Sequence, residues 1–382
     1  VLFLLPGIAT SANSPQAIPG AVGDVLLNTA WTYFEDASER PDGLDQAVPE
    51  TVNLPHSWNS FDATDAAPGY RRDASWYGKQ LTFAEGASRF RHILYFEGAN
   101  MRAEVFVNGK HAGGHVGGYL GFEIEITDLL DFQRDNDILV RVDNSVDRSL
   151  IPSQKADFVL FGGLTRDVHL QVRPAVHIDN VRIDTPSVSA AAASVVSTVF
   201  IDGRKNEPGD YTVEVKALDA QGNAVAGARG EITAGNTQSS HEFVLPNIEN
   251  PALWSPDSPN LYTLEVSLQG PSGDVLHATS EAFGLRWYEY AGDGAFVLNG
   301  KPLLLRGTHR HEEHAGYGAA MPDELHVRDM EMIKEIGANF VRLGHYPQDP
   351  SVYRAADRLG LILWDELPWC RGGLGDKEWQ RN

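Results

Sequence analysis

The fold is decided by three consecutive stretches near the carboxyl end of the sequence: KPLLLRGTHRHEEHAG (301–316), MPDELHVRDMEMIKEIG (321–337) and ANFVRLGHYP (338–347). The first and third are apolar runs that end in polar residues, and the second spaces its apolar residues as a helix does and stops at glycine. This order predicts a strand, a helix and a second strand of one parallel sheet. In such sheets the functional side chains gather at the carboxyl ends of the strands.

A third strand unit follows these stretches. DPSVYRAADRLG (349–360) has helical spacing and stops at glycine, and LILWDELPW (361–369) predicts the next strand. Upstream, FGLRWYEYAGDGAFVLNG (283–300) predicts a strand and then a hairpin that turns at its Asn-Gly pair. We therefore expect the region 283–382 to contain the first three β/α units of an incomplete barrel.

The part of the chain before this region predicts two β-sandwiches. In 24–174, short apolar or alternating runs are separated by Gly, Asn and Asp, which is typical of a sandwich. One of these runs turns at Asn108-Gly109, a dipeptide that favours a tight hairpin. A second set of strands in 175–282 suits an immunoglobulin-like sandwich. Its alanine-rich stretch, 187–197, predicts an edge strand.

The composition is that of an acidic chain that can bury full cores. Apolar residues make up 42% of the 382 residues, and the formal net charge is −21. This charge argues against nucleic acid or an anionic membrane surface as a partner, and it favours a neutral or small-molecule partner. The single cysteine, Cys370, excludes an internal disulfide.

The first residues, VLFLLPGIATSA (1–12), predict the remnant of a signal peptide. The run is apolar, and Thr10 and Ala12 have the spacing of small residues at a signal-peptidase site. An ordinary buried strand is the alternative. No other run approaches the length that a membrane span needs, so we expect a periplasmic or secreted protein without a membrane span.

Three histidines between 309 and 314 raise the question of a metal. The zincin pattern needs a second histidine four residues after the first, but Ala315 stands four residues after His311. Another arrangement stays open. His309 and His311 alternate on a strand, so both imidazoles point to one face and could share a divalent ion, as in metal-dependent hydrolases.

The same strand ends also suit a sugar, because carbohydrate hydroxyls are bound by fixed donors and acceptors beside aromatic faces. Asp365 and Glu366 are adjacent on one strand and point to opposite faces. They therefore cannot be the two carboxylates that glycoside hydrolysis requires. The strand ends offer these candidates: Arg306, His311, Arg342, His345, Tyr346, Asp365, Glu366 and Trp369.

Three motifs resemble glycoside hydrolase family 2, the group of β-galactosidases, β-glucuronidases and β-mannosidases. They occur in the order of the family and are GGLTRDVHL (162–170), RGTHRHEEHAG (306–316), and GANFVRLGHYPQDP (337–350) with DRLGLILWDELPW (357–369). The histidine-rich motif is most similar to the β-galactosidase branch. The resemblance implies a jelly-roll sugar-binding domain, an immunoglobulin-like domain and a TIM barrel that hydrolyses β-glycosides with retention.

The resemblance also assigns residues to the sugar site. His311 and His345 match histidines that contact the sugar and support the transition state in β-galactosidases. Asp157, five residues before the paired glycines, matches an aspartate of the first domain that binds galactose hydroxyls in the active site. Spacing alone would make Asp157 an ordinary loop residue. Three further residues match strand-end positions that shape the pocket or form ion pairs in the barrel mouth: Arg306, Arg342 and Glu366.

Departures from the family set further expectations. Where magnesium-dependent members carry Glu and His ligands after the third strand, this sequence has Cys370 and Gly372, so we expect no magnesium there and no cofactor. The acid/base and nucleophile glutamates of the family follow the fourth and seventh barrel strands, which we expect beyond Asn382. The pair Asn206-Glu207 lies in a turn of the second sandwich and is not the catalytic Asn-Glu pair.

These observations predict the N-terminal part of a retaining hydrolase of β-galactosides or related β-glycosides. This chain alone is expected to be inactive, because it lacks both catalytic carboxylates. Two alternatives stay open: a non-catalytic carbohydrate-binding protein with a degenerate barrel, and a metal-dependent hydrolase that uses His309 and His311. The expected partner is a β-linked sugar, and the apolar faces of the open barrel favour a homo-oligomer.

Overall fold

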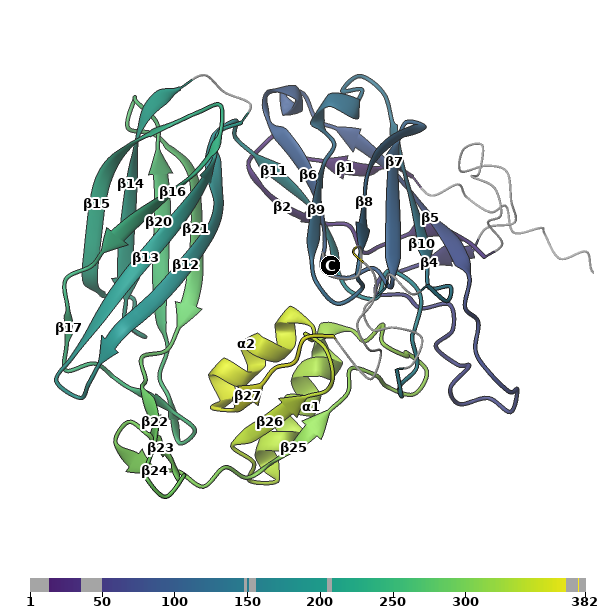
Figure 1. Cartoon of the computed structure of the whole chain (residues 1–382). Coiled ribbons are helices and arrows are strands. Elements are labelled where there is room, and N and C mark those ends of the chain that lie inside the picture. The colour runs from purple at the N-terminus through teal and green to yellow at the C-terminus, as the bar shows by residue number, and fades with distance from the viewer. Residues whose placement is uncertain are drawn as a thin grey trace, which may run out of the picture.

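The computed structural model describes residues 14–35, 50–147, 150, 156–204, 208–368 and 377. Figure 1 shows two β-sandwiches, the first at the upper right and the second at the left, with a small α/β unit below them. None of the described helices is long and apolar enough to cross a membrane. Predictions for the following residues lie outside the described parts: 1–12, Asn206-Glu207, Trp369, Cys370 and Gly372.

The first sandwich packs a seven-stranded sheet against a four-stranded sheet. Burial alternates along strands such as β7, so that every second side chain enters the shared core. The large sheet has the order β4 (Glu50–Val52), β3 (Trp31–Phe34), β5 (Ala74–Phe83), β10 (Asn136–Asp143), β7 (Arg102–Val107), β8 (Lys110–Val116), with β1 (Gln16–Ile18) parallel to β5. The small sheet has the order β2 (Gly23–Leu26), β11 (Val168–Arg173), β6 (Arg91–Phe96), β9 (Phe122–Glu125). Two single 3-10 turns interrupt the strands, one before β6 (Ala87–Arg89) and one between β9 and β10 (Thr127–Leu129).

The turn between β7 and β8 confirms the predicted hairpin. Asn108 and Gly109 have φ angles of 48° and 79°. Positive φ at both central residues is the conformation of the tight turn that matches the twist of paired strands, and Asn-Gly tolerates it best. The local sequence therefore fixes the register of this pair.

The second sandwich contains two antiparallel sheets around its own core. One has the order β12 (His177–Val188), β13 (Ala192–Asp202), β16 (Gln238–Val244), with β17 (Ile248–Glu249) on β13. The other has the order β15 (Ala224–Ala234), β14 (Gly209–Leu218), β20 (Tyr262–Gln269), β21 (Val275–Phe283).

The prediction of an edge strand in 187–197 is wrong. The stretch ends β12 and begins β13, and β13 pairs with β12 on one side and with β16 and β17 on the other. Ala193 and Val195 face the core and are buried. Small side chains suit a crowded interior strand as well as an edge, so composition could not distinguish the two positions.

Two short antiparallel elements lie between the second sandwich and the α/β unit. They are the hairpin β18 (Trp254–Ser255) and β19 (Ser258–Pro259), and the sheet β22 (Tyr288–Tyr290), β23 (Phe296–Leu298), β24 (Lys301–Pro302). Asn299 and Gly300 turn the chain between β23 and β24 with φ angles of 51° and 74°. This confirms the second predicted hairpin.

The α/β unit is a parallel sheet with two helices, as predicted. Its elements are β25 (Gly307–Arg310), α1 (Asp323–Glu335), β26 (Phe340–Leu343), α2 (Pro350–Leu359) and β27 (Ile362–Trp364), with sheet order β25-β26-β27. Met330 of α1 and Val352 and Ala355 of α2 pack with Val341 and Leu343 of β26 in one buried cluster. These are the first three strands of the expected barrel.

The end of α2 joins this unit to the second sandwich. Gly360 has a φ angle of +72° and terminates α2 in the left-handed conformation. The carbonyl oxygen of Pro256, in the β18–β19 hairpin, accepts a hydrogen bond of 2.8 Å from Lys334 Nζ. Trp254 donates from Nε1 to the carbonyl of Asp357 over 2.9 Å. The helix end therefore packs directly on the hairpin.

Replacing Gly360 with alanine should lower the free energy of unfolding by about 2 kcal/mol, because left-handed backbone costs alanine about 1–2 kcal/mol. The added Cβ would also lie 2.6 Å from the Pro256 carbonyl oxygen. Gly337→Ala is the matched control, since Gly337 has a φ angle of +84° and its Cβ would meet nothing within 4 Å. Urea titrations should show the larger loss for Gly360→Ala. Equal losses would contradict this contact.

Candidate active site

Three parallel strands place polar side chains at one edge of their sheet. β25 leads into His311, β26 contains Arg342 and leads into His345, and β27 leads into Glu366. In the register of the sheet, His309 is the partner of Arg342. Because parallel strands end at the same edge, these side chains come together although they are far apart in sequence.

Glu366 holds Arg342 and His345 in place. Arg342 donates from Nε to Glu366 Oε1 over 2.6 Å, and His345 Nδ1 lies 2.8 Å from Glu366 Oε2. A carboxylate only accepts, so Nδ1 of His345 carries the hydrogen, and in the neutral ring Nε2 is the acceptor. Arg342 Nη2 also lies 3.1 Å from Nδ1, but a nitrogen that donates to Glu366 cannot accept from it. Burial opposes ionisation of Glu366, but the bonds from Arg342 and His345 outweigh it and lower the pKa of Glu366.

His311 lies between His309 and His345. Its ring centroid is 5.4 Å from that of His309 and 5.1 Å from that of His345. Burial, followed by positive charge on His345, His309 and Arg342, lowers the pKa of His311, whereas Asp157 acts to raise it. His311 is therefore neutral at pH 7. Its Nδ1 is buried and has no hydrogen-bond partner in the described part of the chain.

A loop of the first sandwich reaches these histidines. The ring of Phe158 lies 5.7 Å from the ring of His311, 6.1 Å from that of His345 and 5.3 Å from that of Tyr346. Asp157, the preceding residue, is exposed and lies close enough to act on the pKa of His311. The structure thus brings Asp157 to the strand ends. Its contact with a sugar hydroxyl stays a prediction.

Aromatic stacking also joins the first sandwich to the strand ends. Tyr346 stacks on Tyr119 with ring centroids 4.0 Å apart and an angle of 17° between the planes. Its hydroxyl accepts a hydrogen bond of 3.3 Å from the backbone N–H of Glu312. Burial raises the pKa of Tyr346, so the phenol stays neutral. Tyr346 therefore forms part of a rigid wall next to His345.

A buried ion pair holds the two strand ends to the first sandwich. Arg166 donates from Nε and Nη2 to the two carboxylate oxygens of Glu312, each over 3.0 Å, and from Nη2 to the carbonyl of Pro347 over 2.7 Å. The two charged side chains are only 4% and 3% exposed. Glu312 follows His311 directly, and Pro347 lies two residues after His345. Arg166 therefore anchors both segments that carry the histidines.

The two adjacent carboxylates at the end of the third strand, Asp365 and Glu366, point in different directions, as predicted. Asp365 accepts a hydrogen bond of 2.7 Å from the hydroxyl of Tyr353 on α2, whereas Glu366 faces Arg342. Retaining glycosidases need two carboxylates that face the same bond. Asp365 and Glu366 are therefore not that pair.

One predicted residue, Arg306, does not join the strand-end cluster. Arg306 precedes β25 at the amino end of the sheet, whereas His311 follows β25, about 16 Å away along an extended chain. This position corrects the prediction that Arg306 shapes the pocket. The apolar run before Arg306 does not form the barrel strand, and its Leu304 is 66% exposed. Trp369 lies outside the described residues.

The interpretation of His309 and His311 as metal ligands gains no support from the structure. The described residues contain three groups of possible metal ligands, and neither histidine belongs to any of them. Zinc sites, which suit imidazole ligands, use three or four protein ligands.

One of those groups faces the α/β unit from the first sandwich. Glu97, Asp167 and His169 offer ligand atoms within 4.8 Å of one another. Opposite them, α1 begins with Asp323 and α2 is capped by Asp349. Burial, followed by the charges of Asp349, Asp167 and Glu97, raises the pKa of Asp323 to about 6. Carboxylates from two domains therefore converge here, and calcium prefers oxygen ligands of this kind.

Known protein families match the three structural parts in the same order. The sugar-binding domain of glycosyl hydrolases family 2 matches residues 27–174, a second domain of that family matches 176–286, and its TIM barrel domain matches 291–377. This chain belongs to glycosyl hydrolases family 2. The predicted family and fold class are confirmed.

Relatives with two kinds of activity are similar to this chain. A "Putative beta-glucuronidase" of Formosa agariphila is 51% identical over 93% of this chain and 42% of its own length. A β-galactosidase of Thermoanaerobacter pseudethanolicus is 32% identical over 94% of this chain and 48% of its own. The chain thus spans about half the length of these relatives.

Solved structures share the fold of nearly the whole chain. The β-glucuronidase of Bacteroides uniformis has a TM-score of 0.86 at 30% identity, over 91% of this chain and 42% of that one. A calcium-binding mutant of B. uniformis β-glucuronidase 2, in which two aspartates are replaced by alanine, has a TM-score of 0.83 at 30% identity, over 91% and 43% of the two chains.

Proposed function

We propose that the whole protein is a retaining hydrolase of β-galactosides or β-glucuronides. The observation that supports this most is the cluster of His311, His345, Arg342 and Glu366 at the strand ends, beside Asp157 of the first sandwich. Fixed donors and acceptors next to the face of Phe158 suit the hydroxyls of one terminal sugar.

Each described side chain has a definite part in this proposal. Neutral His311 and the Nε2 atom of His345 hold sugar hydroxyls, and Glu366 fixes the tautomer of His345. Asp157 accepts from a hydroxyl on the side of the first sandwich. Hydrolysis with retention proceeds through a glycosyl-enzyme intermediate and needs a nucleophile and an acid/base carboxylate. We expect both on later strands of the barrel.

Chromogenic substrates test this proposal. The whole protein should cleave p-nitrophenyl β-galactoside or β-glucuronide, and NMR should show that the first product is the β-anomer. The 382-residue chain alone should release no p-nitrophenol. An α-anomeric first product would contradict retention. Sugar binding without turnover of any β-glycoside by the whole protein would favour the non-catalytic alternative.

A second proposal concerns calcium, and it departs from the expectation of no metal. We propose that Asp323, Asp349, Asp167 and Glu97 hold a calcium ion between the first sandwich and the α/β unit. Hard carboxylate oxygens suit this ion, and its charge would relieve the repulsion that raises the pKa of Asp323. The two aspartates replaced in the calcium-binding mutant of B. uniformis β-glucuronidase 2 have the same sequence separation as Asp323 and Asp349.

Calcium should stabilise the protein by about 2.7 kcal/mol at a hundredfold excess over its dissociation constant. Asp323→Asn should abolish most of this gain, whereas Glu324→Gln, an exposed neighbour in the same first turn of α1, should keep it. Thermal unfolding with calcium and with EDTA measures both effects. If calcium does not raise the unfolding midpoint of the unaltered protein, the proposed site is refuted.

A further inference from the structure

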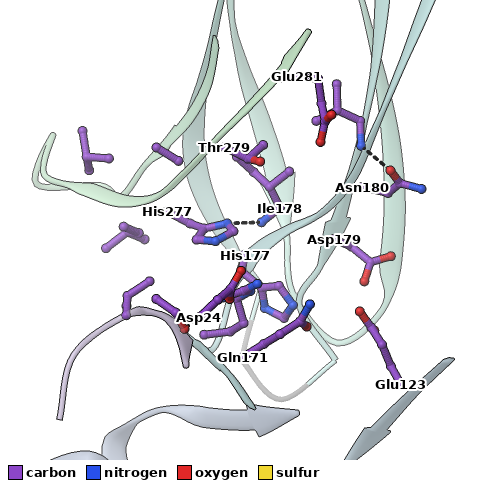
Figure 2. Close-up of a pocket in the computed structure, with 17 residues that line it drawn as sticks. Asp24, Glu123, Gln171, His177, Ile178, Asp179, Asn180, His277, Thr279 and Glu281 are labelled. Atoms are coloured by element: carbon purple, nitrogen blue, oxygen red, sulfur yellow. Dashed lines mark hydrogen bonds and ion pairs between the residues drawn. The ribbon is translucent and has the colours of Figure 1, made fainter. Parts of the chain in front are cut away.

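A cavity lies where the two sandwiches meet, built from residues other than those of the strand-end site. It has a volume of about 420 Å³. Residues of β2, β9 and β11 line it from the first sandwich, and residues of β12 and β21 line it from the second (Figure 2). Pockets for small ligands have volumes of about 300–1,000 Å³ and often form at domain junctions.

Two buried histidines give this cavity one fixed acceptor and one fixed donor. His177 donates from Nδ1 to the carbonyl of Pro174 over 3.2 Å, so its Nε2 is an acceptor. His277 accepts on Nδ1 from the backbone N–H of Ile178 over 3.2 Å, so its hydrogen is on Nε2. Burial is the largest cause that lowers the pKa of each ring to about 4, and both rings are neutral at pH 7.

These ring nitrogens are available for a ligand. His177 is 2% exposed and His277 is 9% exposed, and both line the cavity. In the described part of the chain, neither Nε2 atom has a hydrogen-bond partner. Both rings line the cavity, so a ligand in it can replace water at the two nitrogens and pair with both.

Charge restricts what the ligand can be. Figure 2 shows the carboxylates of Glu123 and Asp179 pointing toward each other at one side of the cavity. Burial, followed by repulsion from Asp179, raises the pKa of Glu123. Arg173, the cation of the lining, is ion-paired with Asp24. The cavity therefore repels anions. A bare cation is disfavoured as well: Asp202, which could hold a metal ion together with His177 and Asp179, is ion-paired with Arg91 and Arg204, and His277 presents an N–H donor.

We propose that this cavity binds a neutral saccharide, as a second sugar site apart from the strand ends. A sugar hydroxyl donates and accepts at once, so it can pair with the acceptor of His177, the donor of His277 and the carboxylates of Glu123 and Asp179. A site of this kind would hold a distant part of a glycan. The proposal does not depend on the proposed hydrolase activity.

NMR of the chain with labelled histidines tests the proposal, with lactose, cellobiose and glucuronate as probes. Both neutral disaccharides should shift the imidazole signals of His177 and His277, and glucuronate should not. A His311→Ala/His345→Ala background, which disables the strand-end site, should leave these shifts unchanged. Binding at the cavity can thus be separated from binding at the strand ends.

Variants sharpen this test. His277→Phe should weaken lactose binding about tenfold, the effect of one lost hydrogen bond. His241→Phe, the same change on β16 of the same sandwich, should not alter it. Asp179 is exposed, so Asp179→Asn should keep the fold, and it should strengthen binding of glucuronate relative to lactose.

Three outcomes would overturn the proposal. If glucuronate shifts the imidazole signals of His177 and His277 more than lactose does, the cavity is an anion site. Shifts of the same signals by calcium or spermidine, with none by lactose, would show a cation site. Lactose shifts that disappear in the His311→Ala/His345→Ala background, or that never occur at the two cavity histidines, would show that sugar binds elsewhere.

Discussion

Replacing Arg166 with methionine should lower the free energy of unfolding by about 3–5 kcal/mol, because Glu312 would then be a buried charge without its partner. Arg166 and Glu312 are almost completely buried and share two hydrogen bonds of 3.0 Å. The unfolding transition of the α/β unit should shift to lower urea concentration, since Arg166 also donates a hydrogen bond to the carbonyl of Pro347. Urea titration followed by tryptophan fluorescence measures the loss.

A double variant tests whether the loss comes from the unpaired charge of Glu312. Arg166→Met combined with Glu312→Leu should recover most of the loss, because apolar residues of similar size can replace a buried pair. Arg182→Met is the control: Arg182 pairs with Asp184 on the exposed face of β12 and should cost less than about 1 kcal/mol. Losses of similar size for Arg166→Met and Arg182→Met would show that the buried pair does not hold the domains together.

In the whole protein, His345→Ala should lower kcat about 10²–10³-fold, the usual cost of removing a group that stabilises the transition state. His345 is fixed by Glu366 and presents Nε2 as an acceptor. His314→Ala is a control from the histidine-rich motif, because His314 is exposed and its ring contacts the carbonyl of Ala315 and the ring of Tyr317, away from the strand-end cluster. Steady-state kinetics with a β-glycoside measures both variants. A change of less than about threefold in kcat for His345→Ala would remove His345 from the mechanism.

Local signals in the sequence were sufficient for much of the fold. The Asn108-Gly109 and Asn299-Gly300 turns, the left-handed Gly360 and the parallel order of three strands all depend on residues close in sequence. Apolar runs were less informative. Leu304 belongs to such a run yet is exposed, because β24 ends at Pro302 and β25 begins only at Gly307. The position assigned to Arg306 was wrong for this reason.

Long-range pairs in the site could not be predicted from one sequence. Arg166 and Glu312 are 146 residues apart, and each lies in a motif that was recognised without its partner. Spacing alone made Asp157 an ordinary loop residue, and only the resemblance to a known family placed it near His311. Phe158, which contacts both histidine rings, gave no signal at all. Such contacts depend on how the domains pack against each other, and hydrophobic periodicity predicts only helices and strands.

The most direct test of the sugar site is a crystal structure of the whole protein with a lactone analogue of galactose or glucuronic acid. We expect the sugar ring at the carboxyl ends of β25 and β26, with hydroxyls within hydrogen-bond distance of His311, His345 and Asp157. A sugar bound away from these three residues, or a metal ion bridging His309 and His311 in its place, would contradict the assignment of the strand ends as the sugar-binding site.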